Sequence, residues 1–188
     1  MSKPELRARF RTLRREHRVA LQRHLDRLNA SDLDALLERR PRPAAAHGHV
    51  GLCWPLADEP DLRPWLQDMN RPVALPAVAA GQLVYRPWQP GQQLEPDDSG
   101  VPAPPAAGPP LQAQAMALML VPALAVDRSA VRLGYGGGWY DRLRSDPAWR
   151  RVPALVVLPA ACVCDALPAD PWDVPFDGWL DEHGCHWI

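Results

Sequence analysis

The sequence predicts a single α/β domain in which a mainly parallel sheet is covered by helices on both faces, a three-layer sandwich. Two observations carry this prediction. The chain has 188 residues, 47% of them hydrophobic, which is enough for one substantial core and too little for two ordinary domains. Short apolar runs of strand character alternate with segments of helical periodicity, as in proteins with parallel sheets. Residues 1–188 are therefore expected to form one domain.

Two helices are predicted at the N-terminal end. Residues 2–30 begin with Ser2 and Glu5 at the spacing of a capping box, and apolar side chains then recur at helical intervals. Residues 31–40 restart this pattern, and Ser31 is the expected cap of the second helix.

Four cations of the first predicted helix gather beside its apolar face. They fall within about 60° of one another on a helical wheel with roughly 100° per residue. They are Lys3, Arg7, Arg14 and Arg18. Because a plain solvated helix has no such bias, these side chains are expected to reach toward a site. Arg9, Arg11 and Arg15 instead fit an ordinary solvated basic face.

The rest of the chain is interpreted as strands joined by short helices and turns. A short helix is expected at residues 59–69. The predicted strands, the last of them at the edge of the sheet, are 49–54, 71–78, 82–88, 117–127, 152–160 and 177–182. Residues 89–110 are rich in proline and glycine, so they are expected to form an ordered excursion or a mobile flap.

Charge and cysteine usage bound the classes of partner and the compartment. A formal net charge of -1 gives no general reason to expect nucleic acid or an anionic membrane as partner. With no apolar run long enough to span a bilayer and no secretion signal, a cytoplasmic protein is expected. The four cysteines fit reduced thiols, although the patterns around Cys162, Cys164, His183, Cys185 and His186 leave a metal site open.

The segment RLGYGGGWYDR, residues 132–142, carries the strongest functional signal. Its glycines stand between an apolar strand ending near Asp127 and a helix beginning near Trp139. Consecutive glycines bring backbone N–H groups close to a ligand, and the helix N-terminus adds partial positive charge, so the expected guest is a phosphate. The pattern matches neither the nucleotide P-loop nor the dinucleotide fingerprint, which indicates a phosphate cradle of another type.

Two charged residues flank this cradle. Arg132 offers charge-assisted hydrogen bonds to a phosphate, and Asp141 offers oxygens to a magnesium ion. The alternative is an ordinary tight turn in which Asp141 pairs with Arg144 one helical turn later.

Residues 120–142 resemble the signature of the 5-formyltetrahydrofolate cyclo-ligase family, also called methenyltetrahydrofolate synthetases, in the form L-V-P-x-L-A-x-D-x(4)-R-L-G-Y-G-G-G-x-Y-D-R. Further segments follow the family's order and extend the resemblance over nearly the whole chain. They are K-x-x-L-R at residues 3–7, W-P-L-x-D-E at 54–59, L-P-A-V at 75–78 and D-P-W-D-V at 170–174.

The resemblance implies a fold, a reaction and its participants. The implied fold is a three-layer sandwich like that of the sugar-phosphate isomerases. The implied reaction is the closure of 5-formyltetrahydrofolate to 5,10-methenyltetrahydrofolate, driven by ATP with Mg²⁺ and releasing ADP and phosphate. The formyl oxygen would attack the γ-phosphoryl group, and the neighbouring nitrogen would displace phosphate from the resulting iminium phosphate. Folate and ATP would be the partners of a monomeric enzyme.

The resemblance also implies roles for residues at matching positions. For ATP they are Lys3, Arg7, Arg132, Leu133, Gly134, Tyr135, Gly136, Gly137, Gly138, Trp139 and Tyr140. For folate they are Trp54, Glu59, Tyr135, Gly136, Gly137, Gly138 and Trp139. Tyr135 and Trp139, shared by both sets, are implied to be catalytic, and Asp141 and Asp173 are implied magnesium ligands.

Several of these residues also fit a purely structural role. Without the resemblance, Trp54 fits a core position, Glu59 an acid at a helix N-terminus and Asp173 a turn residue. The chain departs from the family at Trp139, where tyrosine is frequent, and at Ala130, where glycine is usual before R-L-G. Two other functions stay open, a non-catalytic folate-binding module and an RNA-associated protein that uses the basic first helix.

Overall fold

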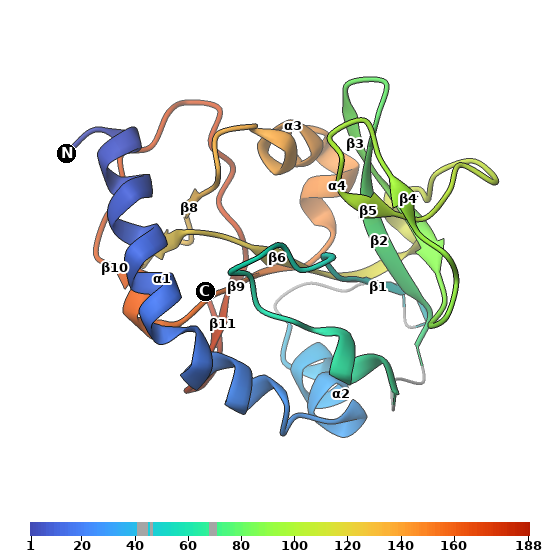
Figure 1. The fold of residues 1–188 in the computed structure, drawn as a ribbon, viewed down its shortest axis with the longest axis horizontal. Coiled ribbons are helices and arrows are strands. Elements are labelled where there is room, and N and C mark those ends of the chain that lie inside the picture. The colour runs from blue at the N-terminus through green and yellow to red at the C-terminus, as the bar shows by residue number, and fades with distance from the viewer. Residues whose placement is uncertain (41–44, 46, 68–70) are drawn as a thin grey trace.

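Among the described residues, seven strands form a central sheet in the order β12-β11-β9-β6-β1-β2-β3 (Figure 1). The structure is a computed structural model that describes residues 1–40, 45, 47–67 and 71–188. The five inner strands are parallel and the two edge strands are antiparallel to their neighbours. In sheet order the strands are β12 (Gly184–Trp187), β11 (Gly178–Asp181), β9 (Ala154–Val157), β6 (Met116–Pro122), β1 (His49–Gly51), β2 (Val73–Ala79) and β3 (Gln82–Trp88).

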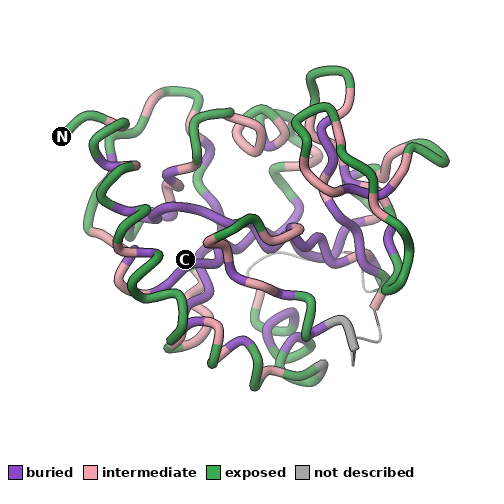
Figure 2. Tube along the Cα trace, viewed as in Figure 1, coloured by how far each residue is buried: buried purple, intermediate pink, exposed green. Residues whose placement is uncertain are grey.

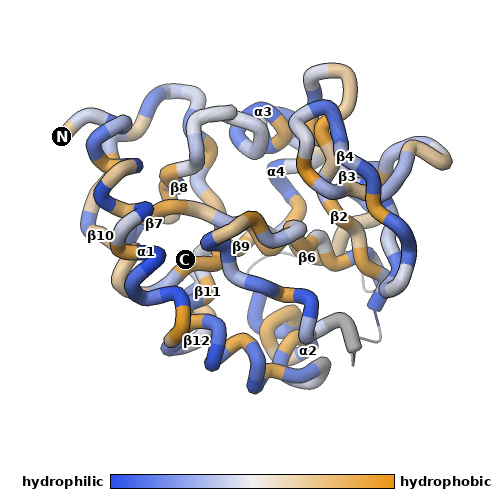
Figure 3. Tube along the Cα trace, in the orientation of Figure 1, coloured by the Kyte–Doolittle hydropathy of each residue, from blue (hydrophilic) through white to orange (hydrophobic). Residues whose placement is uncertain are grey.

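The sheet separates two hydrophobic clusters, which gives the predicted three layers. Successive residues of β6 alternate between them: Met119 and Val121 belong to one cluster, and Leu118 and Leu120 to the other. Both faces of the inner strands are therefore buried, as parallel sheets require. Figure 2 shows these strands as a continuous buried band, and Figure 3 shows the same band as predominantly hydrophobic.

Helices cover both faces. The long helix α1 (Lys3–Leu25) contributes its first half to one cluster and its second half to the other. The helix α2 (Ala30–Glu38) packs in the second cluster, and α3 (Trp139–Ser145) and α4 (Pro147–Arg151) pack in the first. Short 3₁₀ helices lie at η1 (Arg63–Gln67), η2 (Ala113–Ala115) and η3 (Ala160–Cys162). Of the helix predicted at 59–69, residues 68 and 69 lie outside the described residues.

The N-terminal caps confirm one prediction and correct another. The Ser2 N–H donates to Glu5 Oε2 at 2.7 Å within the predicted capping box of α1. The prediction that Ser31 caps α2 was wrong, because Asn29 is the cap and its Oδ1 accepts from the N–H groups of Ser31 and Asp32.

Two strand predictions were also wrong. The apolar run 117–127 is two strands, because the chain turns after Pro122 and continues as β7 (Ala125–Asp127) in a second, three-stranded sheet. This small sheet also contains β8 (Arg132–Leu133) and β10 (Val163–Cys164). The strand predicted at the edge, β11, lies inside the sheet, because the turn at Asp181–Gly184 leads to β12 as the true edge.

The proline-rich segment 89–110 folds back as an antiparallel pair of two-residue strands, β4 (Glu95–Pro96) and β5 (Pro102–Ala103). The Asp97 carboxylate ties it to the sheet by accepting from the Val78 N–H at 2.7 Å. The segment is thus an excursion that hydrogen bonds join to the sheet. Throughout the described ranges, no helix combines the length and the apolar character needed to cross a membrane.

Candidate functional site

The glycine loop, residues 134–138, connects β8 to α3, and α3 begins at Trp139 as predicted. Two of its glycines need their freedom, since Gly136 has φ +112° and Gly138, the N-cap of α3, has φ +63°. The apolar strand expected to end near Asp127 is β7, which ends at that residue. The preceding strand β8 belongs to the small sheet, paired with β7.

The turn before β8 explains one departure from the family pattern. Ala130, at the position where the family usually has glycine, adopts φ +57° and is completely buried. The Asp127 carboxylate stabilises this turn by accepting from the N–H groups of Ser129 and Val131. The turn thus keeps a left-handed residue although the glycine is absent, at a cost of about 1–2 kcal/mol in backbone strain.

The glycine loop borders two cavities, and every residue with an implied role in binding or catalysis lines at least one of them. Arg14 and Arg18, which were also expected to reach toward a site, line neither. The cationic cavity has a volume of about 410 Å³. It is lined by the predicted residues Lys3, Arg7, Arg132, Leu133, Gly134, Gly136, Gly138, Asp141 and Asp173. The aromatic cavity has a volume of about 240 Å³. It is lined by Trp54, Glu59, Arg132, Tyr135, Gly137, Gly138, Trp139 and Tyr140. Arg132 and Gly138 border both cavities.

The residues predicted for ATP do not all line the cationic cavity, and those predicted for folate do not all line the aromatic cavity. Tyr140, assigned to the nucleotide, lines the aromatic cavity, and so do Tyr135 and Trp139, which were assigned to both substrates. Gly136, also assigned to both, lines the cationic cavity alone. Leu133 borders the cationic cavity, but its side chain is buried in the core.

In the cationic cavity, Lys3 joins the start of α1 to the segment that contains Asp170 and Asp173. Its amine lies 2.6 Å from Asp170 Oδ2 and 2.7 Å from Asp173 Oδ2. Burial opposes the charge of Lys3, but hydrogen bonds and attraction from the two carboxylates raise its pKa overall. Burial likewise opposes the charge of Asp173, yet the Asp170 N–H and Lys3 hold its pKa below the usual value.

Two arginines hold the glycine loop in place. Arg7 Nε donates to the Gly134 carbonyl at 3.1 Å, which anchors the loop to α1. Arg132 Nη2 lies 3.5 Å from Asp141 Oδ2, and its guanidinium donates to the Pro122 carbonyl at 3.2 Å. Asp141 is therefore paired with Arg132, whereas Arg144, the partner in the alternative reading, pairs with Asp177 at 3.6 Å.

The predicted magnesium ligands, Asp141 and Asp173, line the same cavity, each beside a cation. Within the described residues, no group of three His, Cys, Asp or Glu side chains is arranged to hold a metal ion. Two carboxylates nevertheless fit Mg²⁺, which commonly binds one or two protein carboxylates and completes its shell with water and phosphate oxygens.

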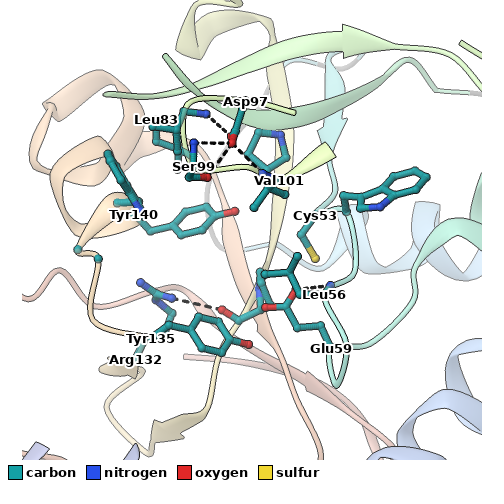
Figure 4. Close-up of a pocket in the computed structure, with 17 residues that line it drawn as sticks. Cys53, Leu56, Glu59, Leu83, Asp97, Ser99, Val101, Arg132, Tyr135 and Tyr140 are labelled. Atoms are coloured by element: carbon teal, nitrogen blue, oxygen red, sulfur yellow. Dashed lines mark hydrogen bonds between the residues drawn. The ribbon is translucent and has the colours of Figure 1, made fainter. Parts of the chain in front are cut away.

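The aromatic cavity is walled by residues from the segments 53–59, 76–83, 97–101 and 132–140 and by Pro122 (Figure 4). The Trp54 ring packs edge-on against Trp88 with centroids 6.2 Å apart, and the Arg63 guanidinium lies 4.8 Å from the Trp54 centroid. Glu59 Oε2 accepts from the Leu56 N–H at 3.0 Å, which fixes the carboxylate at the cavity wall. The cavity therefore combines a flat aromatic wall with one anchored acceptor.

Trp139 has two close neighbours. The Arg142 guanidinium lies 4.5 Å from the indole centroid, and a Cβ placed on Gly137 would lie only 2.6 Å from Trp139 Nε1. The larger ring that replaces the family's frequent tyrosine thus depends on a glycine at position 137.

The excursion contributes three residues of the cavity wall that the sequence did not predict: Asp97, Ser99 and Val101. The Asp97 carboxylate accepts from the N–H groups of Val78, Ser99 and Val101 and from the Ser99 hydroxyl. Burial opposes its charge, but these bonds lower its pKa overall. The string P-D-D-S-G signals a turn, yet it does not reveal that the turn reaches the cavity.

The cysteine and histidine patterns of the tail are spread over different elements. All four cysteines are free thiols, with Cys162 buried in the core and Cys164 on β10. Cys185 and His186 lie on β12, where the His186 ring stacks on Trp179 with centroids 5.0 Å apart.

The fold and the two cavities define an α/β protein in which two cavities meet at one glycine loop. Residues 1–181 match the 5-formyltetrahydrofolate cyclo-ligase family, and the chain belongs to that family. The predicted resemblance is confirmed.

Individual relatives agree with this assignment. A 5-formyltetrahydrofolate cyclo-ligase from Mycolicibacterium smegmatis is 46% identical over 57 residues, which span 30% of this chain and 29% of that protein. The solution structure of the Aquifex aeolicus 5,10-methenyltetrahydrofolate synthetase superposes with a TM-score of 0.73 at 27% identity, covering 100% of this chain and 93% of that one. The Mycoplasma pneumoniae 5,10-methenyltetrahydrofolate synthetase shares the fold, with a TM-score of 0.66 at 19% identity over 97% and 99% of the two chains.

Proposed function

We propose that this protein closes 5-formyltetrahydrofolate to 5,10-methenyltetrahydrofolate, using ATP with Mg²⁺ and releasing ADP and phosphate. The observation that carries the proposal is a single glycine loop with a cationic cavity on one side and an aromatic cavity on the other. A reaction that joins a nucleotide's terminal phosphate to a flat ring system requires such neighbours.

The cationic cavity suits the ATP phosphates. Lys3, Arg7 and Arg132 supply positive charge, and the glycine loop offers backbone N–H groups with no side chains to block the approach. Asp141 and Asp173 would hold Mg²⁺. When bound, the ion supplies positive charge to the phosphate oxygens.

The aromatic cavity suits the pterin of the folate. The Trp54 ring offers a plane for stacking, and the Glu59 carboxylate accepts hydrogen bonds from the amino and ring N–H groups. Val78 and Leu83 add apolar contact. The formyl group on the adjacent nitrogen would then face the glycine loop and, across it, the γ-phosphate.

The chemistry proceeds by activation of a poor electrophile. The formyl oxygen attacks the γ-phosphorus and the bond to ADP breaks, which leaves an iminium phosphate. The neighbouring amine adds to the activated carbon and loses its proton, and the carbon–oxygen bond then breaks to release phosphate. Arg132 and the loop N–H groups would neutralise the phosphate charge. The protein's contribution is alignment, which accounts for about 7–11 kcal/mol of barrier in favourable cases.

The test is the absorbance of the conjugated methenyl product. Purified protein with 5-formyltetrahydrofolate, ATP and Mg²⁺ is expected to form this product, and omission of either ATP or Mg²⁺ is expected to abolish it. Folded protein that forms no product, and that binds folate equally well with and without ATP, would reject the reaction in favour of the folate-binding module.

A further inference from the structure

Arg14 is a buried cation beside the aromatic cavity, and the reaction as proposed does not use it. It lies one helical turn after Phe10 on the face of α1 that packs into the core, and only 5% of it is exposed. Within the described residues, none of the ion pairs involves Arg14, and its Nε has no hydrogen-bond partner. A buried charge without a carboxylate partner is costly, so its placement calls for a reason.

The contact that Arg14 does make is with Tyr135. Its Nη1 donates to the Tyr135 hydroxyl oxygen, and its guanidinium carbon lies 5.2 Å from the Tyr135 ring centroid. The same nitrogen lies 3.5 Å from the Ala123 carbonyl. Arg14 therefore reaches from α1 to the hydroxyl end of a residue that lines the aromatic cavity.

Donor and acceptor chemistry then fixes the direction of the Tyr135 proton. Arginine has donors only, so the tyrosine oxygen must accept from it, and the single hydroxyl proton must point elsewhere. Glu59 lines the same wall as Tyr135 (Figure 4). Burial and the nearby charge of Glu59 raise the pKa of Tyr135, so the hydroxyl keeps its proton at neutral pH.

We propose that Arg14 is a positioning residue for the folate: it fixes the Tyr135 hydroxyl as a hydrogen-bond donor directed into the aromatic cavity, toward Glu59 and the bound pterin. The inference rests on the proposed function. It also explains why a cation occupies this buried position, because an apolar side chain of the same length would leave the hydroxyl free to rotate away from the cavity.

The adjoining cavity supports this placement. A cavity of about 350 Å³ between α1 and the segment 58–60 is lined by both Arg14 and Glu59. Glu59 therefore borders both cavities, with Arg14 lining this one and Tyr135 lining the aromatic one. Loss of the guanidinium would disturb the folate side of the site and leave the cationic cavity, which Arg14 does not line, intact.

The experiment compares Arg14→Met, Arg14→Lys, Tyr135→Phe and the double variant Arg14→Met with Tyr135→Phe. Arg11→Met, an exposed cation on the same helix, is the matched control. We measure kcat, the KM of each substrate, and the Kd of 5-formyltetrahydrofolate by calorimetry, with Tm recorded for every variant.

We expect Arg14→Met to raise the KM and Kd for 5-formyltetrahydrofolate about tenfold while the KM for ATP stays within about twofold. Tyr135→Phe should have a similar effect, and the double variant should be no worse than either single change, because both remove one interaction. Arg14→Lys, which keeps a donor, should recover part of the loss, and Arg11→Met should match the wild type.

A rise in KM for both substrates together, additive single effects, or unchanged folate binding in Arg14→Met would overturn the inference. The two proposals fail separately. A wild-type protein that binds folate without converting it rejects the reaction, and the Kd values still decide the role of Arg14. A wild-type protein that does not bind 5-formyltetrahydrofolate overturns both.

Discussion

At the scale of single residues, Lys3 is the side chain whose chemical type says most about the site. The chain has 21 basic Lys and Arg residues, and Lys3 is its single lysine. It stands at the start of α1 between Asp170 and Asp173, which come from the other end of the chain. An ammonium group is a compact charge with three hydrogen-bond donors. It can therefore bridge two carboxylates, as it does in this structure, and it can also bind a phosphate.

Lys3→Met should therefore lower stability in a pH-dependent way. The pKa of Asp173 is lowered in the folded protein, so its contribution is present above about pH 4 and is lost as the pH falls through the lowered pKa. The pKa of Lys3 is raised, so its contribution is present below about pH 10.4 and is lost as the pH rises through the raised pKa.

Urea unfolding of wild type and Lys3→Met should thus differ by about 0.5–1 kcal/mol, with a flat difference between about pH 5 and pH 9. The difference should shrink toward pH 3. Lys3→Arg keeps the charge and should lose less. A difference that stays constant down to about pH 2.5 would show that the ion pairs are not its source.

At the scale of elements, two neighbouring residues, Asn29 and Ser31, could each cap the start of α2, and the sequence alone does not decide between them. Asn29 Oδ1 accepts from the Ser31 N–H at 2.8 Å and from the Asp32 N–H at 3.3 Å. The Asp32 carboxylate in turn accepts from the Asn29 N–H at 2.9 Å, which closes a capping box. Ser31 already lies inside the helix.

Asn29→Ala should accordingly destabilise the protein by about 1 kcal/mol, because two N–H groups lose their acceptor. Ser31→Ala, two residues away, is the matched control and should change stability by less than about 0.5 kcal/mol. Chemical denaturation measures both. Equal effects of the two substitutions would contradict the assignment of Asn29 as the cap.

The elements also show where prediction from the sequence ended. Periodicity found α1 and the parallel strands because each has a long pattern of its own. It missed the division of 117–127, since all residues of β6 and β7 are buried and the apolar run has no visible break except Pro122. It missed β12 because the turn after β11 depends on Asp181 accepting from the His183 N–H, a contact that apolar spacing does not encode.

In the site too, local sequence patterns predicted contiguous residues and missed those that long-range contacts bring in. Residues 132–141 were predicted together because they are contiguous and carry a motif. Asp97 was missed because its place in the wall depends on a long-range bond to Val78 of β2, which arises only when the excursion folds back over the sheet. Arg14 was placed on the correct helix face by its spacing, but its contact with Tyr135 joins positions 121 residues apart.

At the scale of the whole molecule, one shared wall makes the two cavities dependent on each other. Arg132 and Gly138 border both, and Arg7 fastens the same loop to α1 through Gly134. A ligand that binds in the cationic cavity and orders the loop loses conformational entropy of the loop. A second ligand that then binds in the aromatic cavity does not have to order the loop again. Binding of the nucleotide and of the folate should therefore be positively coupled.

Coupling of this kind is reciprocal: if the nucleotide tightens folate binding by some factor, folate must tighten nucleotide binding by the same factor. Calorimetry with a non-hydrolysable ATP analogue, Mg²⁺ and 5-formyltetrahydrofolate measures both factors without turnover. We expect each to fall in the range of about 5 to 150 that such coupling usually gives, and to be equal within error. A factor of one in both directions would mean that the loop is rigid before either ligand arrives. The glycine loop would then position the two substrates independently, and binding of one ligand would not change the affinity for the other.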